Sequence, residues 1–173
     1  MGIFVTNRPK AFVFEQGQYP EAKAFLSLEA GQGLAALKAK AQRLLAGATD
    51  TNHWNYGHVV FEANEILGRV AVKEGDFAEA RRYLRAAGKI PSPSQLNSFG
   101  PELVLGHELL AHGDKEDREA VLGFLEDMRR LWGDPATRSE GNSRRVSEDH
   151  LKEFDTWCQE VRDGKIPDDP KWR

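Results

Sequence analysis

Histidine spacing is the first pattern in this sequence that could indicate chemistry. His107-Glu108 and His112 fall within one stretch of helical character. In the zinc motif His-Glu-x-x-His, the two imidazoles stand four residues apart and share one face of a helix. Here they stand five apart, and His112 lies at a glycine-containing turn. The sequence therefore predicts no zinc site. A histidine near a helix C-terminus is explained more simply by its favourable interaction with the helix dipole.

A second candidate is the densest cluster of polar and aromatic residues. Aromatic rings provide area in a ligand pocket, and His or Asn side chains give a ligand its direction. A loop before a helix, with its rings folded onto the core, has the same composition, and we favour this simpler interpretation. The cluster consists of Asn52, His53, Trp54, Tyr56 and His58.

The remaining polar candidates are isolated side chains. Cys158 lies on or beside an apolar helical stripe, which indicates a buried thiol rather than a nucleophile. Asn64 falls near a seam between predicted helices, where it either bonds to the local backbone or points into a groove. Asn97 lies in a connector. The sequence contains no glycine-rich phosphate loop, nucleophile elbow or paired-carboxylate motif.

Arginines occur in adjacent pairs between residues 81 and 145. We expect most of them to lie on solvated helix faces, and an anion-binding or nucleic-acid contact is the weaker alternative. The pairs are Arg81-Arg82, Arg129-Arg130 and Arg144-Arg145, with Arg85 near the first.

The elements that must position these residues are predicted to be helices. Apolar residues recur at helical spacing through most of the chain, and no segment alternates with period two over more than a few residues. Asp76 is expected to cap a helix that Gly88 ends. We predict one all-α domain over 1–173. Its elements are N-terminal helices at about 21–46, helical hairpins at about 58–88 and 101–132, and a C-terminal helix at about 147–163.

Two segments of the chain are similar to each other at an offset of 38 residues. Leu67-Gly68 followed by Gly75-Asp76 corresponds to Leu105-Gly106 followed by Gly113-Asp114. A repeat of this length is typical of stacked helical hairpins. We expect the small residues at 68 and 80 to allow two antiparallel helices to approach. The second copy is expected to have extra residues in its turn, around 115–117.

The first copy closely resembles the tetratricopeptide repeat (TPR). The residues that carry the resemblance are Leu67, Gly68, Gly75, Asp76, Phe77, Ala80, Leu84 and Ala87. The resemblance extends to about 132 and includes Ser98-Phe99-Gly100-Pro101, a region similar to small bacterial TPR-like proteins of unassigned role. It implies a right-handed stack of TPR-like antiparallel hairpins with capping helices at both ends.

The resemblance also implies a concave face, built by the first helix of each hairpin, that binds peptides or partner proteins. Projected onto this sequence, the face carries Glu62, Glu65, Arg69 and Lys73, followed by Leu103, His107 and Leu110. Trp54, His58, Asn64 and Asn97 are expected at or near its rim. Glu62 and Glu65 stand where chaperone-binding members need Lys and Asn, so that particular specificity is not implied.

Composition narrows the function classes. The formal net charge is -3, which argues against a dedicated nucleic-acid binder. A single cysteine excludes an internal disulfide and fits a reducing compartment, and we expect a cytoplasmic protein. No stretch approaches the roughly 18 apolar residues of a membrane span.

The leading hypothesis is therefore an interaction module without cofactor or metal, which binds a peptide, a partner protein or a second copy of itself. The alternative is an enzyme or small-ligand binder. This alternative requires a pocket into which His53, His58 and His107 converge, with the polar segment 134–146 as a possible lid.

Overall fold

The structure, a computed structural model, describes residues 33–53, 55–90, 103–133, 148–169 and 172. The described residues form helices joined by turns and contain no strand, which confirms the predicted all-α class. The helices are α2 (Leu34–Gly47), α3 (Tyr56–Glu74), α4 (Phe77–Ala87), α6 (Val104–His112), α7 (Lys115–Gly133) and α8 (Glu148–Arg162). The helix expected near residue 21 and the segment 134–146 lie outside the described residues.

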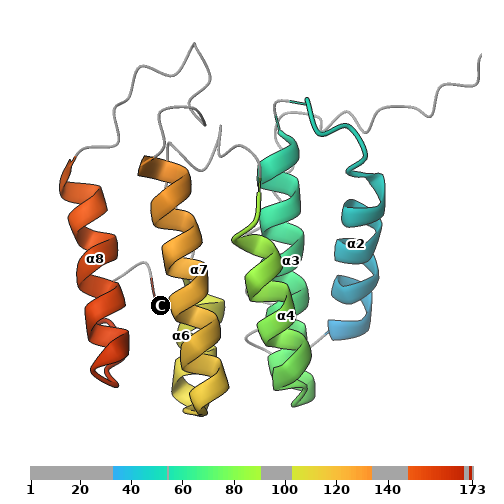
Figure 1. Cartoon of the computed structure of the whole chain (residues 1–173). Helices are drawn as coiled ribbons and strands as arrows, with labels where there is room; N and C mark the ends of the chain where they lie inside the picture. Colours follow the sequence, from blue (N-terminus) through green and yellow to red (C-terminus); the bar gives the residue numbers. More distant parts are fainter. Residues whose placement is uncertain (1–32, 54, 91–102, 134–147, 170–171, 173) are drawn as a thin grey trace, which may run out of the picture.

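The helices stand side by side in two layers (Figure 1). One layer contains α2, α3 and α6, and the other contains α4, α7 and α8. Contacts between α3 and α4, and between α6 and α7, join the layers. Sequence neighbours thus form the pairs α3/α4 and α6/α7, while α2 and α8 pack at opposite ends. No described helix is long and apolar enough to cross a membrane.

The two pairs have matching turns because the local sequence specifies them. Gly75 and Gly113 end α3 and α6 with φ angles of 77° and 94°. Glycine is favoured at both places because side chains make this left-handed region costly. Asp76 caps α4 as predicted, since its Oδ1 accepts a hydrogen bond from the Glu79 backbone N–H at 3.0 Å.

The second turn is shorter than the sequence suggested. Residues 115–117 were expected to enlarge it, but α7 already begins at Lys115. Glu116 and Asp117 lie in the first turn of that helix, where the helix dipole favours acidic side chains. The connection therefore consists of Gly113 and Asp114, and it matches Gly75-Asp76 in length.

Gly68 allows a close approach, although not the expected one. A Cβ built at Gly68 would lie 2.2 Å from Cδ2 of Leu105, which belongs to α6. The missing side chain thus makes room for the neighbouring pair rather than for α4, the antiparallel partner of α3. Leu105 is completely buried there. This contact sets the spacing between the two first helices, α3 and α6.

The core continues across the pairs to the C-terminus. Its larger cluster runs from Phe61 on α3 through α4, α6, α7 and α8 to Trp172. Side chains of α2, α3 and α4 form a smaller cluster around Leu67 and Tyr83. The arrangement therefore packs α3 and α6 beside each other, and these are the helices on which the sequence places the candidate site.

Candidate partner-binding face

An ion pair joins the two helices of the predicted face. Nε of Arg69 on α3 donates to both carboxylate oxygens of Glu108 on α6, at 3.3 Å each, and a second guanidinium nitrogen lies 3.2 Å from Oε1. Arg69 is only 2 % exposed. A buried guanidinium needs such a partner because the loss of hydration is costly. Arg69 is one of the site residues expected from the sequence, whereas Glu108 is not.

Lys73 extends this charge network towards solvent. Its Nζ lies 3.7 Å from Oε1 of Glu108, and its side chain is 35 % exposed. Glu108 thus receives one buried and one accessible cation, one turn apart on α3. Lys73 is the predicted site residue through which this network reaches the surface.

Two further predicted residues, Asn64 and Glu65, are buried on α3. Asn64 donates from Nδ2 to the backbone carbonyl of Val60 at 2.7 Å. Of the two alternatives for this side chain, a bond to the local backbone or a position in a groove, the structure therefore supports the first. Glu65 is 2 % exposed, with both carboxylate oxygens buried. With Arg69, α3 therefore carries three buried polar side chains between residues 64 and 69.

Local contacts surround the start of α3. His58 Nε2 lies 3.5 Å from a carboxylate oxygen of Glu62, one helical turn away, and both side chains are partly exposed. His53 Nδ1 accepts a hydrogen bond from the backbone N–H of Asn55 at 3.2 Å. His107 lies half-buried on α6. Trp54 and Asn97, the other predicted rim residues, lie outside the described residues.

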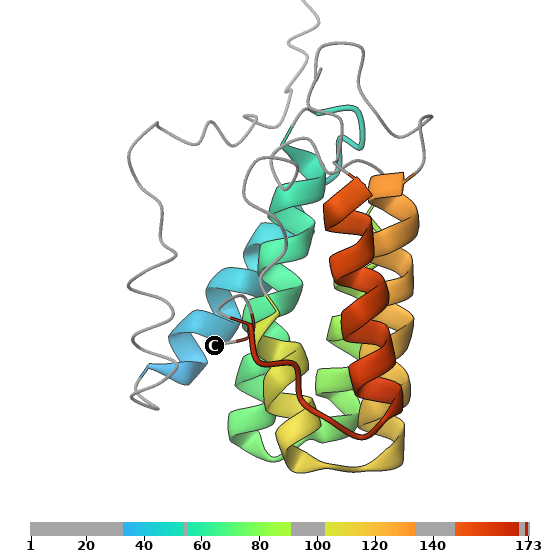
Figure 2. The same cartoon turned by 90° about the vertical axis from the view of Figure 1, so that its left-hand side faces the viewer.

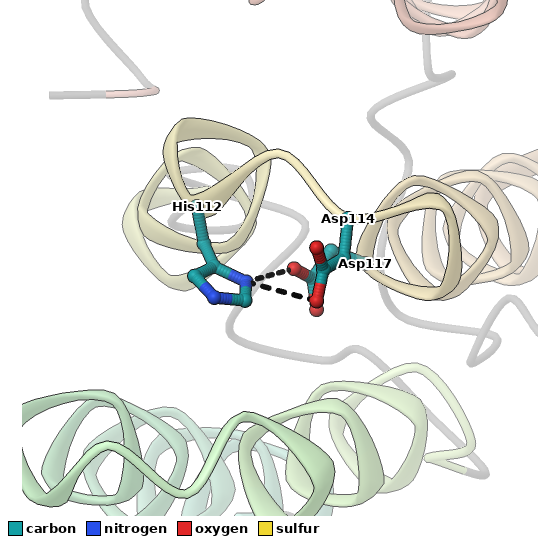
Figure 3. Close-up of side chains that lie close together, drawn as sticks. All are labelled: His112, Asp114 and Asp117. Carbon is teal, nitrogen blue, oxygen red and sulfur yellow. Dashed lines mark hydrogen bonds and ion pairs between the residues drawn. The ribbon is translucent and has the colours of Figure 1, made fainter.

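A second ionic cluster, which sequence analysis missed, joins the pairs at their turns. Asp117 of α7 is fully buried, and Oδ1 accepts a hydrogen bond from Arg81 of α4 at 2.7 Å. Its Oδ2 lies 2.6 Å from Nδ1 of His112, as Figure 3 shows. Phe77 stacks on the His112 ring, with centroids 3.5 Å apart and planes 9° from parallel. These contacts join α4, α6 and α7.

Among the described residues, this cluster contains the one group of side chains whose ligand atoms lie close enough together to hold a metal ion. One ligand atom each from His112, Asp114 and Asp117 lies within 4.8 Å of the others (Figure 3). Arg81 and His112 already contact the two oxygens of Asp117, and Arg81 adds a positive charge that opposes a cation. We therefore interpret the cluster as an ionic tie between helices.

Carboxylates neutralise the arginine pairs that the structure describes. Arg81 contacts Asp117, and Arg129 donates to Asp155 through Nε at 2.6 Å and through a second nitrogen at 2.9 Å. Arg82 and Arg130 pair with Glu79 and Asp127, each three residues earlier on its own helix. The exposed pairs of Arg82, Arg129 and Arg130 favour the interpretation of solvated helix faces, whereas Arg81 reaches the buried carboxylate of Asp117. Arg144-Arg145 lies outside the described residues.

Cys158 lies inside the core, as predicted. It is 3 % exposed, and burial raises the pKa of its thiol. A raised pKa keeps the sulfur protonated at neutral pH, and the thiolate is the reactive form.

The C-terminal segment contributes a feature that the sequence did not reveal. We call residues 165–172 the strap; the structure describes 165–169 and 172. Its described residues 165–169 leave the end of α8 and cross α6 (Figure 2). Trp172 at its end is completely buried, 6.1 Å from Trp157 between ring centroids in an edge-on arrangement. A Cβ built at Gly106 of α6 would lie 3.2 Å from Cζ3 of this indole.

Comparison with known proteins adds no relative. No protein-family model, curated protein or solved structure matches the chain.

Proposed function

We propose that this chain is a TPR-like interaction module that binds a peptide or partner protein through the face of α3 and α6. The observation that carries the proposal is the charge buried along that face. Glu65 and Arg69 are each 2 % exposed, and Arg69 pairs with Glu108 across the two helices.

Buried charge is a poor means of stabilising a fold. Desolvation of a buried ion pair often cancels its Coulomb attraction, so apolar side chains of similar volume would serve a scaffold equally well. The positions that the TPR resemblance assigns to the ligand face are the ones that carry these charges. We propose that the buried Arg69 serves recognition indirectly, by holding Glu108 and through it Lys73 in place.

The network also suits recognition because it is pre-organised. Arg69 fixes Glu108, and Glu108 holds the Lys73 ammonium at 3.7 Å, on the accessible side of the pair. Side chains already held in place lose less conformational entropy when a ligand binds. Glu62, paired with His58, supplies a partly exposed carboxylate on the same helix. The ligand expected here carries charges complementary to this lysine and this carboxylate.

Site-specific photo-crosslinking tests the proposal. A photoreactive amino acid at Lys73 or His107 should give discrete adducts with one partner in cells that produce the protein. The matched control places it at Lys89, an exposed lysine that follows α4. Equal labelling from Lys89 and Lys73 would contradict a binding face on α3 and α6. Charge reversal by Lys73→Glu should abolish the adduct formed from His107, because the partner's acidic group would then be repelled.

A further inference from the structure

The imidazole of His112 is held in a fixed orientation by residues of two neighbouring helices. Its Nδ1 lies 2.6 Å from Oδ2 of Asp117 on α7, and Asp117 is fully buried. Phe77 at the start of α4 stacks on one face of the ring, with the centroids 3.5 Å apart. One ring nitrogen and one ring face are therefore engaged, which fixes the direction in which the other nitrogen points.

The other ring nitrogen, Nε2, stays open to an incoming group. Within the described part of the chain, the polar contacts of His112 all use Nδ1. Figure 3 shows Nε2 directed away from the two neighbouring carboxylates, and the His112 side chain is 30 % exposed. The lone pair of an imidazole nitrogen lies in the plane of the ring, so Phe77, which covers a ring face, does not block it.

An aspartate at Nδ1 and an accessible Nε2 together favour a nucleophilic histidine. The hydrogen bond made by one ring nitrogen decides which nitrogen carries the proton, and a carboxylate acceptor at Nδ1 leaves the lone pair on Nε2. The same carboxylate offsets the positive charge that the ring gains when Nε2 forms a bond. Arg81 donates to Oδ1 of Asp117 at 2.7 Å, so Oδ2 remains for the ring. A tie between helices requires only the contact at Nδ1, whereas the open Nε2 adds the capacity to react.

We infer that His112 is an acyl-acceptor site, at which Nε2 attacks a small, uncharged, activated acyl compound. The Nε2 lone pair forms a bond to the carbonyl carbon, and the bond from that carbon to the leaving group breaks, so that the leaving group departs with the electron pair. The Nδ1 proton stays on the ring, hydrogen-bonded to Asp117. An uncharged donor is favoured over an anionic one because carboxylate oxygens of Asp117 and Asp114 lie 2.6 and 3.6 Å from Nδ1. The site does not depend on the charged network of the proposed function.

The first test labels the full chain with diethyl pyrocarbonate, an uncharged donor that transfers an ethoxycarbonyl group and releases carbon dioxide and ethanol. His53 is the internal control because it is exposed and its Nδ1 accepts a hydrogen bond, which places the proton of its neutral ring on Nε2. Mass spectrometry of timed samples at pH 7 should show His112 modified at least roughly tenfold faster than His53, because only His112 has its Nε2 lone pair available. Equal rates at the two histidines would overturn the inference.

Two substitutions in the cluster test Asp117 as the positioning residue. In Asp117→Asn the amide can donate to Nδ1, which moves the ring proton to Nε2, so labelling of His112 should slow by at least roughly tenfold. Asp114→Asn is the matched control because Asp114 is 58 % exposed and lies 3.6 Å from Nδ1, and it should change the rate by no more than about twofold. The rate at His53 in each sample, together with circular dichroism, verifies that the fold is intact. Wild-type labelling of His112 in a folded Asp117→Asn variant would refute the assignment.

A measurement on the wild-type chain protects the inference against misfolding of the Asp117 variant. The ¹⁵N chemical shifts of the imidazole nitrogens, recorded at a pH where the rings are neutral, report which nitrogen carries the proton. His112 should carry it on Nδ1 and His53 on Nε2. A neutral His112 with its proton on Nε2 would reject the inference even if Asp117→Asn fails to fold. Failure of these tests leaves the crosslinking result at Lys73 unaffected.

Discussion

At the scale of single residues, the fold depends on a few polar groups placed where water is excluded. Asp117 is fully buried, and Arg81 and His112 contact its two carboxylate oxygens. Asp155 pairs with Arg129 on the surface, where the two side chains are 57 % and 43 % exposed. Because Asp117 is buried and Asp155 is exposed, we expect their ion pairs to contribute differently to the free energy of unfolding.

Replacing these aspartates should separate buried from exposed ion pairs. Asp117→Asn should lower the free energy of unfolding by about 2–4 kcal/mol, because partly buried cations lose their carboxylate. Asp155→Asn, the matched control, should cost about 0–1 kcal/mol, because solvent screens the pair. Urea denaturation followed by circular dichroism measures both. Similar losses would show that the Asp117 cluster is no stronger than a surface pair.

Cys158 should be nearly inert until the chain unfolds. Its raised pKa and its burial predict that iodoacetamide modifies the native thiol at least roughly 100-fold more slowly than the urea-unfolded thiol at pH 7. The sign of the pH effect follows from the same shift. Above the ordinary thiol pKa, the unfolded chain ionises first, so stability falls as the pH rises towards the folded pKa. Mass spectrometry of timed samples gives the rates, and fast native labelling would contradict this prediction.

At the scale of elements, close contact between α3 and α6 depends on a missing side chain. A Cβ at Gly68 would approach Leu105 to 2.2 Å, so one of the two helices would have to move. Gly123 on α7 has open space beside it within the described structure. Both glycines lie inside helices, but packing restricts only one of them.

Alanine substitution should therefore have opposite effects at these glycines. Gly68→Ala should destabilise the protein by about 1–3 kcal/mol through overpacking, despite the better helix propensity of alanine. Gly123→Ala should stabilise it by about 0.5–1 kcal/mol, since only the propensity changes. Thermal unfolding of the two variants beside the wild type provides the comparison. A stabilising Gly68→Ala would mean that Leu105 adapts without cost.

At the scale of the whole molecule, the contacts between pairs indicate that the described helices unfold together. Leu105 packs at Gly68, Glu108 holds Arg69, and Asp117 holds Arg81. Each of these contacts links an element before residue 90 to one after residue 103. Trp132, Trp157 and Trp172 are all buried in the later half, so their fluorescence monitors that half alone.

Fluorescence and circular dichroism should consequently give coincident urea transitions in a Trp54→Phe variant. That substitution removes the tryptophan from the earlier half of the chain, so the two probes sample different parts of the molecule. Coincidence is the test of a two-state transition. If fluorescence changed at a lower urea concentration than helicity, the contacts between pairs would be too weak to couple the halves.

The sequence by itself determined the local features of this protein. Helical periodicity located the helices, Gly75 and Gly113 marked the turns, and Asp76 marked a cap, because each depends on residues only a few positions apart. The resemblance to tetratricopeptide repeats also led to the proposal that Arg69 and Lys73 belong to a binding face.

Only the tertiary structure decided which distant residues meet. It revealed that Gly68 faces α6 rather than α4, that Glu108 is the partner of Arg69, and that Asp117 is buried. It also placed Trp172 against Gly106. Such pairings depend on how the helices stack and on which charges lose their water, and neither is encoded in the spacing of neighbouring residues.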